Sequence, residues 1–213
     1  MEPTYELKGK PKLLIVDGAG TLFDPGSVVP AYAFQRAFAE KRLEVDLPTI
    51  CKYMGRQKKQ HINLLLNEPG VLAQFQSEND REPDDNDIEA LYSEFKNQLY
   101  PSADQTKEIP GVKEAAFKLR EAGIPLVMTT GYDRTMVDET RKKLPWLDDV
   151  LTDSYTSSDV ESGRPAPDMI YKAMEAAGVT KVSHTVKIGD TKVDMEAPDN
   201  VCMPGIIVTS GSI

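Results

Sequence analysis

Four groups of polar residues follow short apolar runs, at the points where strands would end and loops begin. The groups are Asp17, Thr129-Thr130-Gly131, Gly163-Arg164-Pro165 and Gly189-Asp190-Thr191-Lys192-Val193-Asp194. If the runs are strands of one parallel sheet, all four groups meet at the edge where such sheets bind ligands. A carboxylate at that edge can attack phosphorus and form an acyl phosphate.

The residue types in these groups fit phosphoryl transfer. Asp17 is the candidate nucleophile, and together with Asp190 it can hold a hard, oxygen-seeking cation such as Mg2+. The hydroxyl and backbone N–H groups at Thr130 and Gly131, with the guanidinium of Arg164, can hold the charged oxygens of a substrate.

Each group also has an ordinary structural explanation. An Asp after a strand is more often a helix cap or a turn former than a catalytic residue. Thr130 could be an N-cap, and Arg164 could be a surface cation. Asp194, one turn after Asp190, either binds a metal-coordinated water or orients the loop. The convergence of all four groups on one rim favours the catalytic interpretation.

The elements that position these groups alternate between strand and helix. We expect strands at 12–16, 124–128, 150–152, 185–188 and 206–208, and helices at 111–122, 133–143, 167–177 and 192–197. The apolar runs lack alternation, which is typical of strands buried on both faces. The pattern predicts an α/β fold with a Rossmann-like parallel sheet core.

Residues 25–108 break this rhythm because they have helix-like apolar spacing and no convincing strand. We expect an inserted all-helical cap domain there, with the core formed by residues 1–24 and 109–213. The expected cap helices are 29–41, 49–54, 58–66, 71–77 and 87–100. The acidic stretch 78–87 is expected to be a solvated loop.

Composition limits the classes of partner. The chain has 213 residues, 40% of them hydrophobic, and a formal charge of −9, which repels nucleic acid and anionic membranes. Its start lacks the apolar core of a signal peptide, and no run of eighteen apolar residues occurs. The only cysteines, Cys51 and Cys202, fit no zinc spacing and are expected to be buried thiols. We therefore expect a cytoplasmic protein with a small-molecule substrate.

The four groups resemble, in order and spacing, the four signature motifs of the haloacid dehalogenase superfamily. The first motif of that superfamily reads Asp-x-Asp-x-Thr, and its second Asp protonates an oxygen leaving group. Here the segment is Asp17-Gly18-Ala19-Gly20-Thr21, so Ala19 occupies the position of the acid. An ordinary phosphatase would be crippled by that change.

The phosphonoacetaldehyde hydrolase family shares this departure, since it cleaves a P–C bond whose carbon leaves as an enamine. The family forms the enamine through a cap lysine in a Met-Gly-x-x-Lys-x-x-His motif. The segment Met54-Gly55-Arg56-Gln57-Lys58-Lys59-Gln60-His61 matches that motif. The resemblance implies that Lys58 forms a Schiff base with the substrate aldehyde and that His61 moves protons.

Lys58 and His61 share a helix face at a spacing of three residues. An unperturbed lysine is only about 0.04% deprotonated at pH 7, so Lys58 needs a lowered pKa. Burial beneath the cap, with cations nearby, would supply it. The alternative is that Lys58 and Lys59 are a basic helix surface.

The resemblance implies further assignments. Met54 and Tyr132 line the substrate pocket, although Met54 is equally compatible with an apolar core role. Mg2+ is bound by Asp17, the Ala19 carbonyl and Asp190. The family dimerises through the first cap helix, so we expect a homodimer here too. The residues expected at the interface are Val28, Val29, Tyr32, Phe34 and Phe38. The alternative is that these residues form the core of the cap.

Several positions depart from the family pattern. Gly18 replaces a bulky aromatic residue, Ser27 a frequent cysteine, and Cys202 and Ile207 replace glycines. The chain stops at Ser212-Ile213, where family members continue through another helical segment. A smaller residue 18 and a missing tail are expected to open the pocket. Two other functions therefore stay open: a small-metabolite phosphatase that uses Asp17, and a degraded member that binds a phosphorylated ligand or protein.

Overall fold

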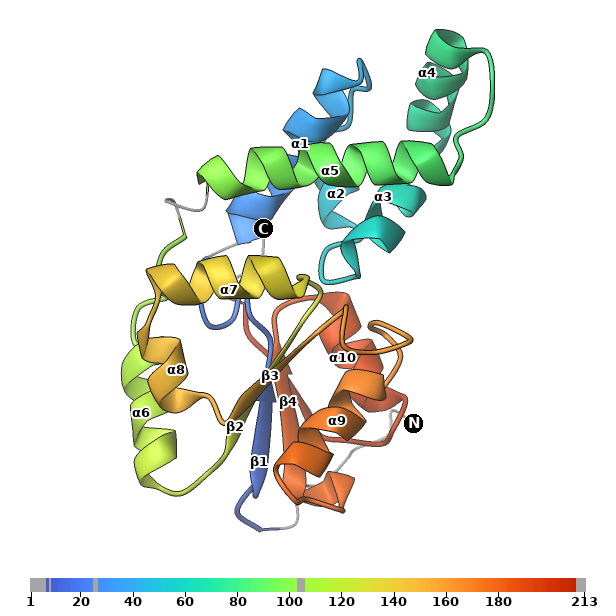
Figure 1. Cartoon of the computed structure of the whole chain (residues 1–213). Helices are drawn as coiled ribbons and strands as arrows, with labels where there is room; N and C mark the ends of the chain where they lie inside the picture. Colours follow the sequence, from blue (N-terminus) through green and yellow to red (C-terminus); the bar gives the residue numbers. More distant parts are fainter. Residues whose placement is uncertain (1–6, 8, 25–26, 103–105, 210–213) are drawn as a thin grey trace.

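The computed structural model describes residues 7, 9–24, 27–102 and 106–209, and one parallel sheet organises much of this part of the chain (Figure 1). The sheet order is β3-β2-β1-β4-β5. Its strands are β1 (Leu13–Val16), β2 (Leu126–Thr130), β3 (Asp153–Thr156), β4 (Thr185–Gly189) and β5 (Gly205–Ile207). The strand order reverses at β1, so a ligand crevice is expected beside the carboxyl ends of β1 and β4. The α/β fold class is confirmed.

Helices cover both faces of the sheet because β1 is apolar on both sides (Figure 1). Leu13 and Ile15 pack towards α9 (Asp168–Ala176) and α10 (Lys192–Asp199). Leu14 and Val16 belong to a second cluster, which includes residues of α6 (Val112–Glu121) and α8 (Trp146–Val150). Successive side chains of a strand point to opposite faces, and this fixes the two layers.

Between residues 27 and 102 the structure describes helices and no strand. They are α1 (Val28–Glu40), α2 (Leu47–Cys51), α3 (Lys58–Leu66), α4 (Pro69–Asn79) and α5 (Asp85–Ser102). These helices lie beyond the carboxyl ends of the strands (Figure 1). The rings of Phe34 and Phe95 stack at 4.2 Å where α1 packs on α5.

The two connections to the helical segment run side by side, since Phe23 and Glu108 form an antiparallel bridge. The expected boundary at residue 25 lies outside the described residues, and the division into two domains stays a prediction. Among the described residues, no helix is long and apolar enough to cross a bilayer.

Side-chain caps explain where several helices begin. The Asp46 carboxylate accepts a hydrogen bond from the Thr49 N–H at 2.8 Å and starts α2. Asp133 accepts one from the Met136 N–H at 2.8 Å and starts α7 (Arg134–Lys143). Such caps satisfy N–H groups that have no partner within the helix. The cap of α7 is therefore Asp133, and Thr130 lies within β2.

The prediction of a strand at 150–152 is wrong, because Trp146–Val150 is helical and the strand is Asp153–Thr156. Trp146, Leu147 and Val150 are buried on one face of this short helix. The strand itself is polar, so apolar runs did not reveal it. A helix at 146–150 was not predicted.

The prediction that both cysteines are buried is also wrong, since Cys202 is exposed and Cys51 is half-buried. Cys202 lies in the turn between α10 and β5 with φ of +55°, a left-handed conformation that favours glycine.

Candidate active site

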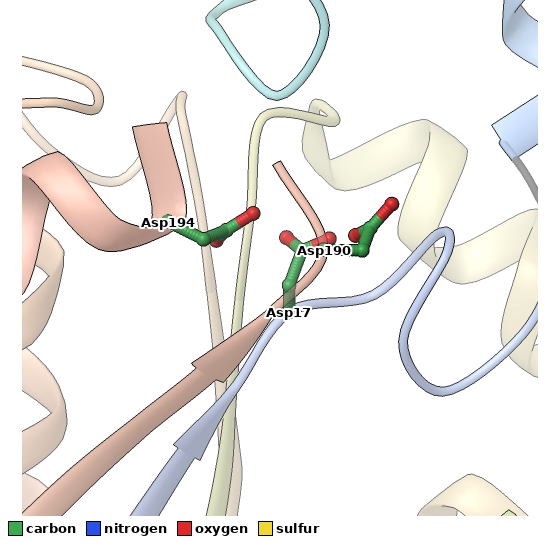
Figure 2. A group of neighbouring side chains, drawn as sticks. All are labelled: Asp17, Asp190 and Asp194. Carbon is green, nitrogen blue, oxygen red and sulfur yellow. The ribbon is translucent and has the colours of Figure 1, made fainter. Parts of the chain in front are cut away.

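Three carboxylates meet at the ends of β1 and β4, which are neighbouring strands (Figure 2). Asp17, Asp190 and Asp194 each offer an oxygen, and the three oxygens lie within 4.8 Å of one another. Figure 2 shows the Asp17 and Asp190 side chains pointing towards the loops above the sheet. The parallel sheet brings together residues that are more than 170 positions apart in sequence.

Asp17 is held by Arg164, whose Nη1 atom donates to Asp17 Oδ1 at 2.7 Å. Both side chains are almost fully buried. Burial raises the pKa of Asp17, and the Arg164 charge opposes that shift. The interpretation of Arg164 as a surface cation is therefore wrong, because the guanidinium lies beside the candidate nucleophile.

Asp194 is saturated with hydrogen-bond donors. Its Oδ1 atom accepts from Lys187 Nζ at 2.7 Å and from Arg164 Nη1, and its Oδ2 atom accepts from the Thr191 hydroxyl at 2.6 Å. Burial acts to raise the pKa of Asp194, but the charges of Arg164 and Lys187 outweigh burial and lower the pKa to about 2. The geometry fits a residue that anchors Arg164 and caps α10.

Asp190 is the more open of the carboxylates beside Asp17. Its Oδ1 atom accepts a hydrogen bond from the Thr21 hydroxyl at 3.2 Å. Burial, followed by the negative charges of Asp17 and Asp194, raises the pKa of Asp190 to about 7. A side chain at Gly20, where φ is +87°, would overlap this carboxylate. A divalent cation at this place would relieve the repulsion between the carboxylates.

Lys58 is the first residue of α3, and only 4% of its surface is exposed. Burial, helped by the Arg164 charge, lowers the pKa of Lys58 to about 8, although Asp17 and Asp24 act in the other direction. The positive end of the helix dipole also favours a neutral amine at this position. The structure thus supplies the burial and the nearby cation that a nucleophilic amine needs.

His61 lies one turn further along α3 and is fully buried. Its Nε2 atom is 2.9 Å from the carbonyl oxygen of Ile50, so Nε2 carries the proton and donates. Burial, then the charge of Lys58, lowers the pKa of His61 well below its ordinary value. Its ring centroid lies 4.2 Å from that of Phe34, and Nδ1 has no partner among the described residues.

Most of the predicted site residues line a small cavity of about 20 Å³. Its lining includes these residues from the predicted set: Asp17, Ala19, Met54, Lys58, Thr130, Gly131, Tyr132 and Arg164. Thr129 is buried in β2 and does not line the cavity. His61 lies behind Lys58, and Asp190 and Asp194 lie beside the cavity rather than in its wall.

The cavity can hold a single water molecule but not a substrate of several heavy atoms. The loop before α3 closes it, since a side chain at Gly131 would lie 2.5 Å from the Arg56 carbonyl oxygen. A larger groove of about 590 Å³ lies among α1, α2 and α4, and none of the predicted site residues line it. The loop before α3 therefore lies directly against the carboxyl end of β2, and the cavity is closed in this structure.

Sequence reasoning missed several residues of the site. Ser27, Pro30, Gly55 and Thr191 also line the cavity, and Lys187 anchors Asp194 from within β4. Gly55 and Thr191 stand inside recognised motifs, which was the available signal. Nothing in the local pattern marks a lysine within an apolar strand as a buried partner.

Gly18 does not open the site. A side chain at this position would begin 3.0 Å from the Phe23 ring and 3.4 Å from Met128 Sδ. Phe23, which is 1% exposed, fills the space that a larger residue 18 would claim. The expectation of a wider pocket at this position is wrong because Phe23 compensates. The chain end at Ser212-Ile213 lies outside the described residues.

Comparison with known proteins places this geometry in a family. A sequence model of the haloacid dehalogenase-like hydrolases matches residues 11–200. A phosphonoacetaldehyde hydrolase of Parabacteroides distasonis is 33% identical over 201 residues, which cover 93% of this chain and 76% of the relative. One from Bacillus cereus is 34% identical over 207 residues, which cover 95% and 77%.

Solved structures agree with the sequence comparison. A phosphonoacetaldehyde hydrolase-like protein from Oleispira antarctica superposes with a TM-score of 0.91 at 28% identity, covering all of this chain and 77% of that one. Fold, family model and relatives all point to one group. The chain belongs to the haloacid dehalogenase-like hydrolases and, within them, to the phosphonoacetaldehyde hydrolase family.

Proposed function

We propose that this protein hydrolyses the P–C bond of phosphonoacetaldehyde and releases acetaldehyde and phosphate. The observation that carries the proposal is one cavity that holds both a buried amine, Lys58, and a buried carboxylate, Asp17, with Ala19 in place of an acid. An oxygen leaving group needs an acid at position 19, whereas an enamine leaving group needs the amine. The relatives carry the name of this activity.

The reaction begins at Lys58. Its neutral amine attacks the aldehyde carbon, water leaves, and a protonated imine forms. Asp17 then attacks phosphorus, and the electron pair of the P–C bond moves into the imine to give a neutral enamine and an aspartyl phosphate. Water hydrolyses the aspartyl phosphate, and protonation of the enamine carbon followed by hydrolysis of the imine releases acetaldehyde.

Charged and polar groups around the cavity support binding of the phosphonate. Arg164 donates a hydrogen bond to Asp17, so its guanidinium lies within reach of the oxygens on a phosphorus atom that Asp17 attacks. Thr130 and Gly131 end β2 at the same cavity, where their N–H and hydroxyl groups are the expected anion ligands. Met54 and Tyr132 contribute apolar walls.

His61 is proposed to exchange the proton of Lys58. It is neutral and one turn away from Lys58, and its Nδ1 atom has no competing partner among the described residues. Because His61 is outside the cavity wall, transfer needs a water molecule or the opening movement of the helical segment.

The donor set fits Mg2+. Carboxylate oxygens of Asp17 and Asp190 lie close together and are hard ligands, and the Ala19 carbonyl is the third proposed ligand. When bound, Mg2+ would shield the attacking carboxylate from the charged oxygens on phosphorus. Burial, followed by the negative charges of Asp17 and Asp194, raises the pKa of Asp190, and a bound cation would oppose that shift. Asp194, with its oxygens already occupied by donors, would orient the loop rather than bind the metal directly.

The proposal is tested by trapping the imine. Borohydride added with phosphonoacetaldehyde should inactivate the protein permanently and add mass to Lys58. Lys58→Arg cannot form the imine and should lose at least about a thousandfold in turnover, whereas Lys59→Arg, next to it and half-exposed, should not. Asp17→Asn should stop phosphate release and still allow trapping.

Near-normal turnover of Lys58→Arg would remove the imine mechanism and favour a phosphatase that uses Asp17 alone. Trapping without any phosphate release would instead favour a degraded, ligand-binding member of the family.

We also propose a homodimer through α1. Val29, Phe34 and Phe38 are buried in the core, so any interface must use Val28 and Tyr32, which are 37% and 43% exposed. Two apolar side chains on one helix offer a starting patch for a symmetric contact. Sedimentation at micromolar concentration should show a dimer that Tyr32→Glu dissociates, and a wild-type monomer under these conditions would contradict the proposal.

A further inference from the structure

Three aromatic rings surround the Lys58 nitrogen. The centroids of Phe34, Phe95 and Tyr132 lie 5.5, 5.9 and 5.1 Å from Nζ. The rings come from α1, from α5 and from the loop after β2, so the cage forms only when the helical segment is closed on the sheet. All three residues are buried.

Lys58 and the lysine that follows it both lie near aromatic rings, but they differ in their carboxylate partners. The Lys59 ammonium forms a salt bridge with Glu89. Among the described residues, none accepts a hydrogen bond from Lys58, and no carboxylate lies within ion-pair distance of it. The rings therefore favour a positive charge on Nζ at short range, because the face of an aromatic ring attracts cations, and the carboxylates of Asp17 and Asp24 act in the same direction.

Neighbouring contacts hold these rings in place. Phe34 stacks on Phe95 at 4.2 Å and contacts the His61 ring at the same centroid distance. Phe34 and Phe95 are fully buried and Tyr132 nearly so. Turning a ring away from Lys58 would therefore require repacking of the core.

We propose that Phe34, Phe95 and Tyr132 form an aromatic cage that positions the Lys58 nitrogen and stabilises its cationic forms in place of a carboxylate counter-ion. This inference rests on the proposed function. The protonated imine carries a positive charge that must withdraw the electron pair of the P–C bond. A carboxylate paired with it would neutralise that demand and hold the nitrogen by a hydrogen bond. Aromatic faces stabilise the charge more weakly and leave the lone pair of the free amine unengaged.

The cage predicts that ring electron density, and not only ring shape, controls Lys58. Replacing Phe95 by mono-, di- and trifluorinated phenylalanine withdraws electron density from the ring face with little change in shape. The charged groups that act on Lys58, namely Arg164, Asp17 and Asp24, stay the same along this series. The control is the same series at Phe38, which is buried in α1 one turn after Phe34 and is not among the rings around Nζ.

Two readouts separate the cage from the proposed function. NMR of lysine labelled with 13C at Cε gives the Lys58 pKa without any substrate, and we expect it to fall stepwise, by about one unit for the trifluorinated ring. Trapping with acetaldehyde and borohydride measures imine formation, and at neutral pH the apparent imine equilibrium constant should change less than about twofold over the same series, because the ammonium and the protonated imine are both cations that the rings stabilise. Neither quantity should change in the Phe38 series.

A Lys58 pKa that is constant along the Phe95 series would overturn the cage, whatever the activity. A pKa that falls stepwise while wild-type protein traps no aldehyde would support the cage and remove the imine function. Equal falls in the Phe95 and Phe38 series would show an effect of fluorine on general stability and would also overturn the cage.

Discussion

Burying the Lys58 ammonium should cost folding stability, and replacing it by an apolar side chain of similar length should recover that cost. We predict that Lys58→Met abolishes imine formation and makes the protein more stable at neutral pH. The side chain is 4% exposed and has no salt bridge among the described residues, so its charge is poorly compensated. Methionine fills similar space without a charge.

The magnitude follows from the pKa of Lys58, which is 10.5 ordinarily and about 8 in the folded protein. At about 1.4 kcal/mol for each pH unit, this difference is equivalent to about 3 kcal/mol. Below pH 8 both folded and unfolded chains carry the proton, so the full cost applies. Between pH 8 and 10.5 the unfolded chain binds more protons than the folded one, so wild-type stability rises with pH and the advantage of Lys58→Met shrinks.

The assay is urea unfolding of wild type and Lys58→Met at pH 7 and at pH 10. The difference in unfolding free energy should be about 3 kcal/mol at pH 7 and less than about 1 kcal/mol at pH 10. Lys59→Met is the matched control, because its side chain is 43% exposed and should change stability little at either pH. Equal differences for Lys58→Met at the two pH values, or a less stable variant at pH 7, would refute the conclusion that burial of the Lys58 ammonium costs more than its surroundings restore.

Three further predictions concern the closed site, the buried charges and the metal. Gly55→Ala should lower turnover at least about tenfold, because φ is +85° and the new methyl group would overlap Thr191. Gly70→Ala is the control and should leave turnover unchanged, because the space around Gly70 is open. Equal turnover of the two variants would contradict the contact between Gly55 and Thr191. Lys187→Met should lower the unfolding free energy by about 3 kcal/mol in urea, because it removes one partner of the buried Asp194, and an unchanged midpoint would contradict the pairing. Chelator treatment should stop phosphate release and added Mg2+ should restore it, so full turnover of chelated protein would show that the metal assignment is wrong.

Local patterns were enough for much of the fold and part of the site. The apolar run that ends at Asp17 is a strand, and the helix expected at 58–66 is α3. Burial on both faces makes a strand continuously apolar, and a helix with one buried face has its own period, so these elements are written into neighbouring residues. The strand pattern predicted that Asp17 and Arg164 lie at one edge of the sheet, and resemblance to a family motif added Lys58 to the same predicted site.

Other features exist only because the folded chain brings particular strands and side chains together. The polar strand Asp153–Thr156 is held by its pairing with β2, so its own sequence gives little sign of it. The loss of bulk at Gly18 is offset by the Phe23 ring, five residues later in a folded turn. A pairing partner or a filled space is a property of the assembled chain, which no local period encodes.

The charge balance of the site is also a property of the folded chain that local sequence does not show. Lys187 interrupts an apolar strand, and only the structure shows Asp194 beside it. Burial of Lys58 was expected from the sequence, but the rings that surround its nitrogen come from three separate elements. A buried charge is stabilised or destabilised by every group within several ångströms, whatever its position in sequence. The sequence alone therefore determined which groups could react, and the tertiary structure decided which of them are charged, held and accessible.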